Sequence, residues 1–241
     1  MTILKVKFDN LTINQAVAQT IGLLGAGRKF EVNFLNADCL RISQKNPAYR
    51  DVLNCSELVL PDGVALKLAA WLFGLGKIHN CNGTDFSPEL MRQAALKGYK
   101  IFLLGSAEGV AKQAGQKLQE QIPGIKIVGT HTGYFKDDAP VVNEINTSGA
   151  DILFVAMGVP KQEKWIAANR SELNPKLCLG VGALLDYISG RVVRAPKIFR
   201  VLKIEWLWRV FMEPRRMFKR YFVDGFGFMF WLIWKRVFPR S

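Results

Sequence analysis

Short apolar runs alternate along the chain with longer stretches of helical pattern, and this alternation constrains the fold more than any other feature of the sequence. It is typical of parallel strands joined by crossover helices. Several runs are apolar throughout, as expected for strands covered on both faces of a sheet. The sequence therefore predicts an α/β fold built on a Rossmann-like parallel sheet. The predicted strands cover residues 31–35, 58–60, 101–104, 125–128, 152–156 and 177–181, and the predicted helices cover residues 37–44, 64–71, 86–97, 108–121, 162–170 and 183–189.

The last part of the chain, residues 191–241, differs in composition from the rest. It holds 13 of the 33 Lys and Arg residues, 13 of the aromatic residues and only three acidic side chains. The first 190 residues have 20 basic and 17 acidic side chains, so the basic character is local. A chain of that length can bury a core of its own. We expect an α/β core over residues 1–190 and a helical appendage over residues 191–241.

Cationic and aromatic side chains are interleaved in this appendage, as in residues 205–209 and 215–222. Such a mixture suits the interface where anionic lipid head groups meet hydrocarbon. The apolar run at residues 225–234 is short of the roughly 20 residues that a spanning helix needs, so we expect it to lie in that interface. Nucleic-acid phosphates also attract Arg with aromatics, although the run has no polar groups to read bases. A buried C-terminal helix or an oligomer contact is a further alternative.

The N-terminus and the cysteines indicate a reducing compartment. No long apolar segment and no small-residue cleavage site follows Met1, so no secretory signal is visible and we expect the core to be cytoplasmic. Cys39, Cys55, Cys81 and Cys178 are scattered without CxxC spacing. This pattern argues against a disulfide framework and against a structural zinc site. We expect four reduced thiols.

Polar loops follow several predicted strands, at the edge where open parallel sheets bind ligands. Asp62 follows the strand at residues 58–60, where its carboxylate could act as a base, although Pro-Asp-Gly is also ordinary turn chemistry. Gly105 and Ser106 lie between a strand and a helix, whose free N–H groups suit a diphosphate. This loop fits neither GxGxxG nor a Walker A motif, and a plain strand-to-helix turn is the alternative.

Three more loops complete the predicted binding site. Residues 158–163 bring polar groups to the sheet edge that could hold a base, a ribose or phosphates, or that only form the first turn of a helix. The loop at residues 80–85 binds substrate or only caps the next helix. The candidates in these loops and their neighbours are Asn36, Asn82, Thr84, Asp85, Gly158, Pro160, Lys161, Gln162, Glu163 and Asp186.

We predict no metal site and no cofactor. His79 and His131 lack neighbours at ligand spacing. Asp137 and Asp138 differ in spacing from a metal-binding DxD motif and adjoin Lys136, so we interpret them as a surface turn.

Six motifs, taken in order along nearly the whole chain, resemble the WecG/TagA/CpsF family of glycosyltransferases. The motifs are Leu60-Pro61-Asp62-Gly63, Phe102-Leu103-Leu104-Gly105, Gly158-Val159-Pro160-Lys161-Gln162-Glu163, Gly180-Val181-Gly182-Ala183 with Asp186, Arg194-Ala195-Pro196, and Glu205-Trp206-Leu207-Trp208-Arg209 with Glu213-Pro214. The resemblance implies a bacterial enzyme of surface polysaccharide synthesis. Such an enzyme moves a sugar from a UDP-sugar to a polyprenyl-diphosphate-linked saccharide, with inversion and without a catalytic metal. It would lie at the cytoplasmic face of the inner membrane as a peripheral or monotopic protein, with no nucleic-acid partner.

The resemblance also implies roles for individual residues. Asp62 would be the general base, Gln162 and the Gly105 loop would help to bind the nucleotide, and Arg209 and Arg216 with Lys219 would grip phosphates.

Two departures from the family's pattern bear on the donor sugar. Phe34 stands where members that transfer N-acetylmannosamine usually carry threonine, and Asn80 replaces an arginine. The donor therefore stays open between an N-acetylmannosamine type and glucose. A nucleic-acid-binding module is the alternative function, and a dinucleotide-dependent oxidoreductase is disfavoured by the lack of GxGxxG.

Overall fold

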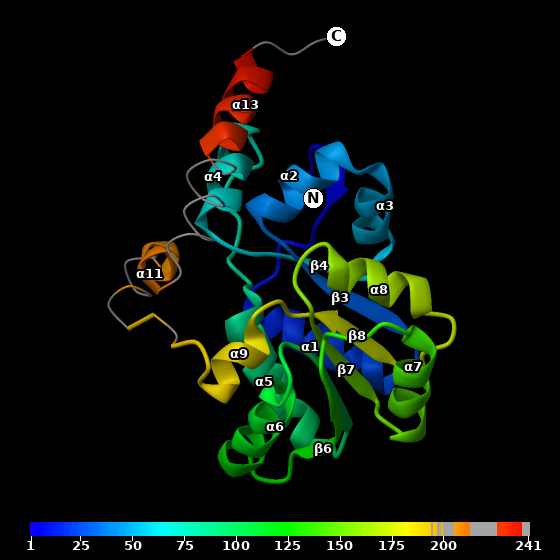
Figure 1. Ribbon diagram of the computed structural model, residues 1–241. Coiled ribbons are helices and arrows are strands. Elements are labelled where there is room, and N and C mark those ends of the chain that lie inside the picture. The colour runs from blue at the N-terminus through cyan, green and yellow to red at the C-terminus, as the bar shows by residue number, and fades with distance from the viewer. Residues whose placement is uncertain (194, 197–198, 200–204, 213–225, 238–241) are drawn as a thin grey trace.

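The computed structural model describes residues 1–193, 195–196, 199, 205–212 and 226–237 (Figure 1). Six parallel strands in this part of the chain form one sheet in the order β4-β3-β8-β7-β5-β6. The predicted α/β fold with a Rossmann-like parallel sheet is confirmed. The strands are β3 (Phe30–Leu35), β4 (Leu58–Pro61), β5 (Lys100–Gly105), β6 (Lys126–His131), β7 (Ile152–Ala156) and β8 (Leu177–Gly180).

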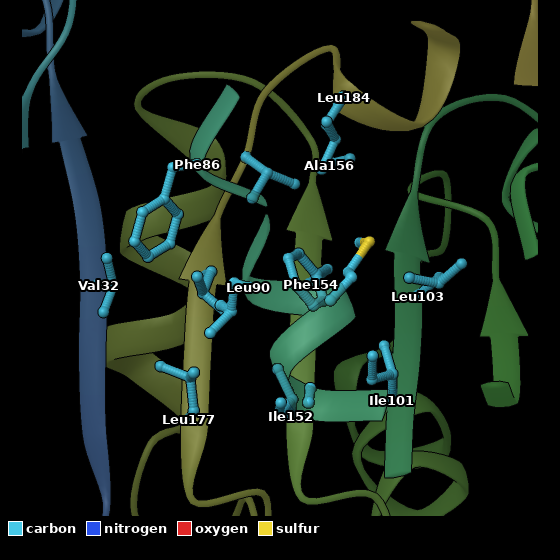
Figure 2. Close-up of a cluster of buried hydrophobic side chains, with 14 of the residues drawn as sticks. Val32, Phe86, Leu90, Ile101, Leu103, Ile152, Phe154, Ala156, Leu177 and Leu184 are labelled. Atoms are coloured by element: carbon cyan, nitrogen blue, oxygen red, sulfur yellow. The ribbon is translucent and has the colours of Figure 1, made fainter. Parts of the chain in front are cut away.

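Helices cover both faces of this sheet, which is why its strands are apolar throughout (Figure 1). Successive residues of a strand point to opposite faces. Ile152 and Phe154 of β7 pack on one side (Figure 2), and Leu153 and Val155 pack on the other. The first side is covered by α1 (Ile13–Gly25), α5 (Gly83–Leu96), α6 (Val110–Gln121) and α9 (Leu184–Ser189), and the second by α2 (Ala37–Lys45), α3 (Pro47–Cys55), α7 (Asp138–Thr147) and α8 (Lys161–Asn169). Helix α4 (Val64–Leu72) lies beyond the end of the sheet and adds to the apolar cluster of α2 and α3 (Figure 1).

Several elements were absent from the sequence prediction, and one interpretation was wrong. Asp137 and Asp138 do not form a surface turn, because Asp137 Oδ1 accepts from the Ala139 N–H at 3.1 Å and caps α7. Helix α5 begins three residues earlier than predicted, because Asn82 caps it. The other unpredicted elements are α1, α3 and a hairpin of β1 (Thr2–Ile3) and β2 (Val6–Lys7).

Two helices of the C-terminal appendage are described, α11 (Glu205–Met212) and α13 (Phe226–Val237). Helix α13 packs against α4, and Phe228 and Leu232 are buried in the same apolar cluster as Leu66 and Ala70. The alternative of a packed C-terminal helix therefore holds for one side of α13. Among the described helices, none is long and apolar enough to cross a membrane.

Candidate functional site

The loops after β5 and β7 diverge at the carboxyl edge of the sheet. These strands are neighbours, yet the helix after β5 covers one face and the helix after β7 covers the other. Ligands bind at such switch points in open α/β sheets. Gly105 has φ 135°, and a Cβ there would lie 2.4 Å from the carbonyl oxygen of Ala156. Glycine is therefore required where the first loop passes β7.

Ser106 joins this loop to the segment after β8. Its hydroxyl donates to Asp186 Oδ2 at 3.2 Å, and Arg191 Nη1 lies 3.9 Å from Asp186 Oδ1. The carbonyl oxygen of Ser106 accepts from the Gly133 N–H at 2.9 Å, which brings in the loop after β6. The structure therefore brings together two predicted residues that are 80 positions apart in the chain.

Gln162 connects the loops after β7 and β8. Its side-chain oxygen accepts from the N–H groups of Gly158 at 3.1 Å and of Gly182 at 2.9 Å. Its amide nitrogen donates to Glu163 Oε1 at 2.8 Å. Both side chains are buried, so they support the loops from below and do not face solvent. Burial also raises the pKa of Glu163 to about 7.

Gly180 leaves the room that Gln162 occupies. A Cβ at Gly180 would lie 2.8 Å from Gln162 Nε2 and 2.9 Å from Asn33 Oδ1. Both distances are far inside van der Waals contact, so the buried amide network requires glycine at this point of β8.

Lys161 is exposed at the start of α8, directly after Pro160. Its Nζ donates to the carbonyl oxygen of Gly133 at 2.9 Å and lies 5.9 Å and 5.7 Å from the ring centroids of Tyr134 and Phe135. These contacts hold a cation beside the loop of Ser106, where an anionic ligand would be stabilised.

Asp62 lies at the end of β4, next to the loop that precedes α5. Its N–H donates to the Leu35 carbonyl oxygen at 2.8 Å. The carbonyl oxygen of Pro61 accepts from the Cys81 N–H at 2.8 Å, and the Gly63 N–H donates to Asn80 Oδ1 at 2.7 Å. The partly buried Asp62 is thus framed on both sides by contacts to residues 80–81.

The loop before α5 also brings a second carboxylate to this region. Burial, together with the negative charges of Asp62 and Asp85, raises the pKa of the Cys81 thiol to about 12. The Asn82 side chain accepts from the Asp85 N–H at 2.9 Å and from the Thr84 hydroxyl at 2.7 Å. Asn82, and neither Thr84 nor Asp85, therefore caps the helix.

The predicted residues thus lie in two groups at the carboxyl edge of the sheet. Asn36, which caps α2, lies with Asp62, Asn82, Thr84 and Asp85 at the ends of β3 and β4, and Gly105, Ser106, Gly158, Pro160, Lys161, Gln162, Glu163 and Asp186 lie at the ends of β5, β7 and β8. Arg209 lies on α11, where its backbone alone is described, and Arg216 and Lys219 lie outside the described residues. Within the described ranges, no three His, Cys, Asp or Glu side chains gather as metal ligands.

Comparison with known proteins decides the family. The model of the glycosyl transferase WecG/TagA/CpsF family matches residues 1–241. The chain belongs to this family. A similar protein from Staphylococcus aureus (strain MRSA252), named N-acetylglucosaminyldiphosphoundecaprenol N-acetyl-beta-D-mannosaminyltransferase, is 31% identical over 218 residues, which cover 89% of this chain and 85% of that protein. A protein of the same name from Bacillus spizizenii (strain ATCC 23059 / NRRL B-14472 / W23) is 33% identical over 174 residues, which cover 72% of this chain and 68% of its own.

The resemblance predicted from the motifs is confirmed, and this WecG/TagA/CpsF protein is a glycosyltransferase. Sequence reasoning missed the part of the site contributed by the loop after β6. A Cβ at Gly133 would lie 3.1 Å from Gly105 Cα, so the two loops are in close contact. The predicted strand ended at residue 128, whereas β6 continues to His131. A longer strand would have placed Thr132 and Gly133 at the carboxyl edge with the other loops.

Proposed function

We propose that the protein transfers a sugar from a UDP-sugar donor to a polyprenyl-diphosphate-linked saccharide, with inversion at the anomeric carbon. The observation that carries this proposal is the likeness to the Staphylococcus aureus relative over 89% of the chain. The relative's name specifies N-acetylglucosaminyldiphosphoundecaprenol as the acceptor and N-acetylmannosamine as the transferred sugar. The product would be a disaccharide or longer saccharide on its lipid diphosphate, as bacterial surface polysaccharide synthesis requires.

The general base in this proposal is Asp62. Its carboxylate takes the proton of the acceptor hydroxyl while the hydroxyl oxygen attacks the anomeric carbon and UDP departs from the opposite side. Removing a general base typically costs about 10²–10⁴ in rate. Its position at the end of a buried parallel strand supports this role, because the hydrogen bonds to residues 35, 80 and 81 hold the backbone on both sides of it.

The nucleotide diphosphate would bind at the switch point between β5 and β7. Gly109 cannot cap α6 with a side chain, which leaves N–H groups of the first turn for an anion. Lys161 lies beside the same loop, and Gln162 holds the loops after β7 and β8 in place. Arg209, Arg216 and Lys219 of the appendage would stabilise charge on the departing diphosphate, a role that metals fill elsewhere.

Phe34 and Asn80 are proposed to help select the donor sugar, either an N-acetylmannosamine type or glucose. Asn80 accepts a hydrogen bond from the residue after Asp62, and Phe34 of β3 lies beside Leu60 of β4 in the sheet. A Cβ at Gly83 would lie 3.3 Å from the Phe34 ring, and Asn80 Oδ1 accepts from the Gly63 N–H. A change at either position would therefore alter the loops on which Asp62 depends.

Membrane association through the basic appendage, at the cytoplasmic face, completes the proposal. The exposed aromatic side chains of α13 and its terminal Lys235 and Arg236 support it. The nucleic-acid-binding alternative has no specific observation in its favour.

A donor screen tests the transferase activity. The full-length protein is mixed with a short-chain polyprenyl-diphosphate N-acetylglucosamine and, in separate reactions, UDP-N-acetylmannosamine, UDP-glucose and UDP-N-acetylglucosamine, and the products are weighed by mass spectrometry. We expect the acceptor to gain one sugar from one of these donors, with an Asp62→Asn variant as the inactive control. No product from any UDP-sugar would overturn the proposal.

A further inference from the structure

Helix α4 of the α/β core leaves an apolar face uncovered. Val64, Leu68 and Trp71 are 48%, 50% and 70% exposed. They recur at intervals of four and three residues, which places them on one face of the helix. The opposite side of α4 is buried in the core through Leu66 and Ala70. The helix is therefore apolar on both sides. Among the described residues, the side with Leu66 and Ala70 is covered, and the side with Val64, Leu68 and Trp71 is exposed.

Helix α13 repeats this arrangement and is attached to α4. Phe230, Ile233 and Trp234 are 70%, 46% and 46% exposed, while Phe228 and Leu232 are buried against the α4 cluster. The pairing is held at its end by Arg236, whose Nε donates to the carbonyl oxygen of Leu72 at 3.2 Å. In Figure 1 the two helices lie together at one end of the molecule, beyond the sheet.

The charges on this helix pair are of one sign. Residues 64–79 include Lys67 and Lys77 and no acidic residue, and α13 includes Lys235 and Arg236 and no acidic residue. Lys235 Nζ lies 4.7 Å from the centroid of the Trp231 ring, so a cation and an aromatic side chain occur together. Exposed Val, Leu, Ile and Trp side chains next to Lys and Arg match the boundary between anionic head groups and acyl chains. A nucleic-acid surface would complement the charges but would leave the aliphatic side chains in water.

We propose that α4 and α13 together form one surface that contacts an anionic lipid bilayer, so that the α/β core itself touches the membrane. The identity of the lipid-linked acceptor rests on the proposed function, whereas the membrane-contacting surface rests on the exposed residues alone. Contact through α4 would also fix the position of Asp62 relative to the bilayer. Helix α4 begins two residues after Asp62, so contact through α4 brings the proposed base close to the depth at which a lipid-linked diphosphate sugar is found.

The test measures partitioning of full-length variants onto vesicles of phosphatidylglycerol and phosphatidylcholine. A Leu68→Gln/Trp71→Gln variant removes the exposed apolar side chains of α4, and we expect about tenfold weaker partitioning. Turnover on a water-soluble acceptor analogue should stay within about twofold of wild type, because neither side chain belongs to the proposed site. The matched control is Leu96→Gln on α5, which removes a side chain that is 80% exposed away from this surface and should leave partitioning unchanged.

Each other result has one meaning. The proposal is overturned if the double variant partitions onto vesicles as wild type does. It is also overturned if wild type forms an oligomer that the two substitutions dissociate while vesicle binding is unchanged, because a second copy of the chain would then cover α4. Weaker partitioning with an unchanged melting temperature supports it even if no sugar transfer is found, so failure of the proposed function remains distinguishable. Ile233→Gln/Trp234→Gln on α13 is the second variant, and its wild-type partitioning would also count against a joint surface.

Discussion

Asp62 lies at the end of a buried strand, beside a second loop that carries Asp85, and its proposed role is to accept a proton. We predict that Asp62→Asn lowers turnover by about 10²–10⁴-fold, because the amide keeps the size of the side chain but cannot take a proton. UDP affinity, measured by calorimetry, should change little. Asp51→Asn, an exposed carboxylate on α3, is the control and should be fully active. Turnover of Asp62→Asn within a few-fold of wild type would exclude this role.

We predict that the buried Glu163 carboxyl group makes the free energy of unfolding depend on pH. Burial raises its pKa from 4.5 to about 7. Between these values the folded protein binds a proton that the unfolded chain releases, so the free energy of unfolding falls as the pH rises through this range and is then level.

Glu163→Gln removes this ionisation and keeps an oxygen that can accept from Gln162. We expect the melting temperature of the variant, relative to wild type, to be higher at about pH 8 than at about pH 5, with a free-energy difference on the order of a few kcal/mol. Thermal unfolding at both pH values measures it. If the melting temperatures of wild type and Glu163→Gln differ by the same amount at both pH values, the raised pKa of Glu163 is contradicted.

Among the secondary-structure elements, β8 and α8 are in such close contact that a single added methyl group at Gly180 should push them apart. Gly180→Ala would place a Cβ 2.8 Å from Gln162 Nε2. We expect a loss of about 1–3 kcal/mol in the free energy of unfolding and a raised KM for the donor, because Gln162 Oε1 holds the N–H groups of two site loops. Gly22→Ala in α1 is the control, since its Cβ meets nothing within 4 Å and alanine favours helix. Equal stability of the two variants would refute this account.

In the whole molecule, the appendage is proposed to serve two separable purposes. Arg216→Ala should lower turnover on a soluble acceptor analogue by roughly tenfold or more, because a cation at the leaving diphosphate is lost, and should leave vesicle binding close to wild type. Deletion of residues 225–241 should weaken vesicle binding more than it lowers turnover on the soluble analogue. The deletion should also lower the melting temperature, because fully buried Leu232 packs in the α4 cluster.

Flotation with anionic vesicles, turnover and thermal unfolding measure these effects, and Arg240→Ala is a matched charge control. If the deletion leaves the melting temperature unchanged, α13 does not contribute to the stability of the core. If Arg216→Ala is fully active, the appendage has no part in catalysis beyond anchoring.

Local signals along the chain were enough to predict the six parallel strands and the class of fold. Buried parallel strands are apolar throughout, so runs such as residues 152–156 are recognisable without knowledge of their neighbours. Helix α7 was missed because its buried stripe consists of Val141, Val142 and Ile145 alone, a short pattern that makes sense once the sheet beneath it is known. The family could also be identified from the sequence, because the motifs that resemble it are contiguous segments of the chain, and the family model matches residues 1–241.

Contacts between distant residues required the folded structure. Ser106 meets Asp186, Gln162 meets Gly182, and α13 meets α4, and each contact depends on strand order and on the face that a crossover helix takes. No local pattern encodes these choices, because many strand orders satisfy the same alternation of apolar runs and helices. For the same reason only the folded structure shows that the Glu163 side chain is buried beneath the loops and that Val64, Leu68 and Trp71 of α4 are exposed.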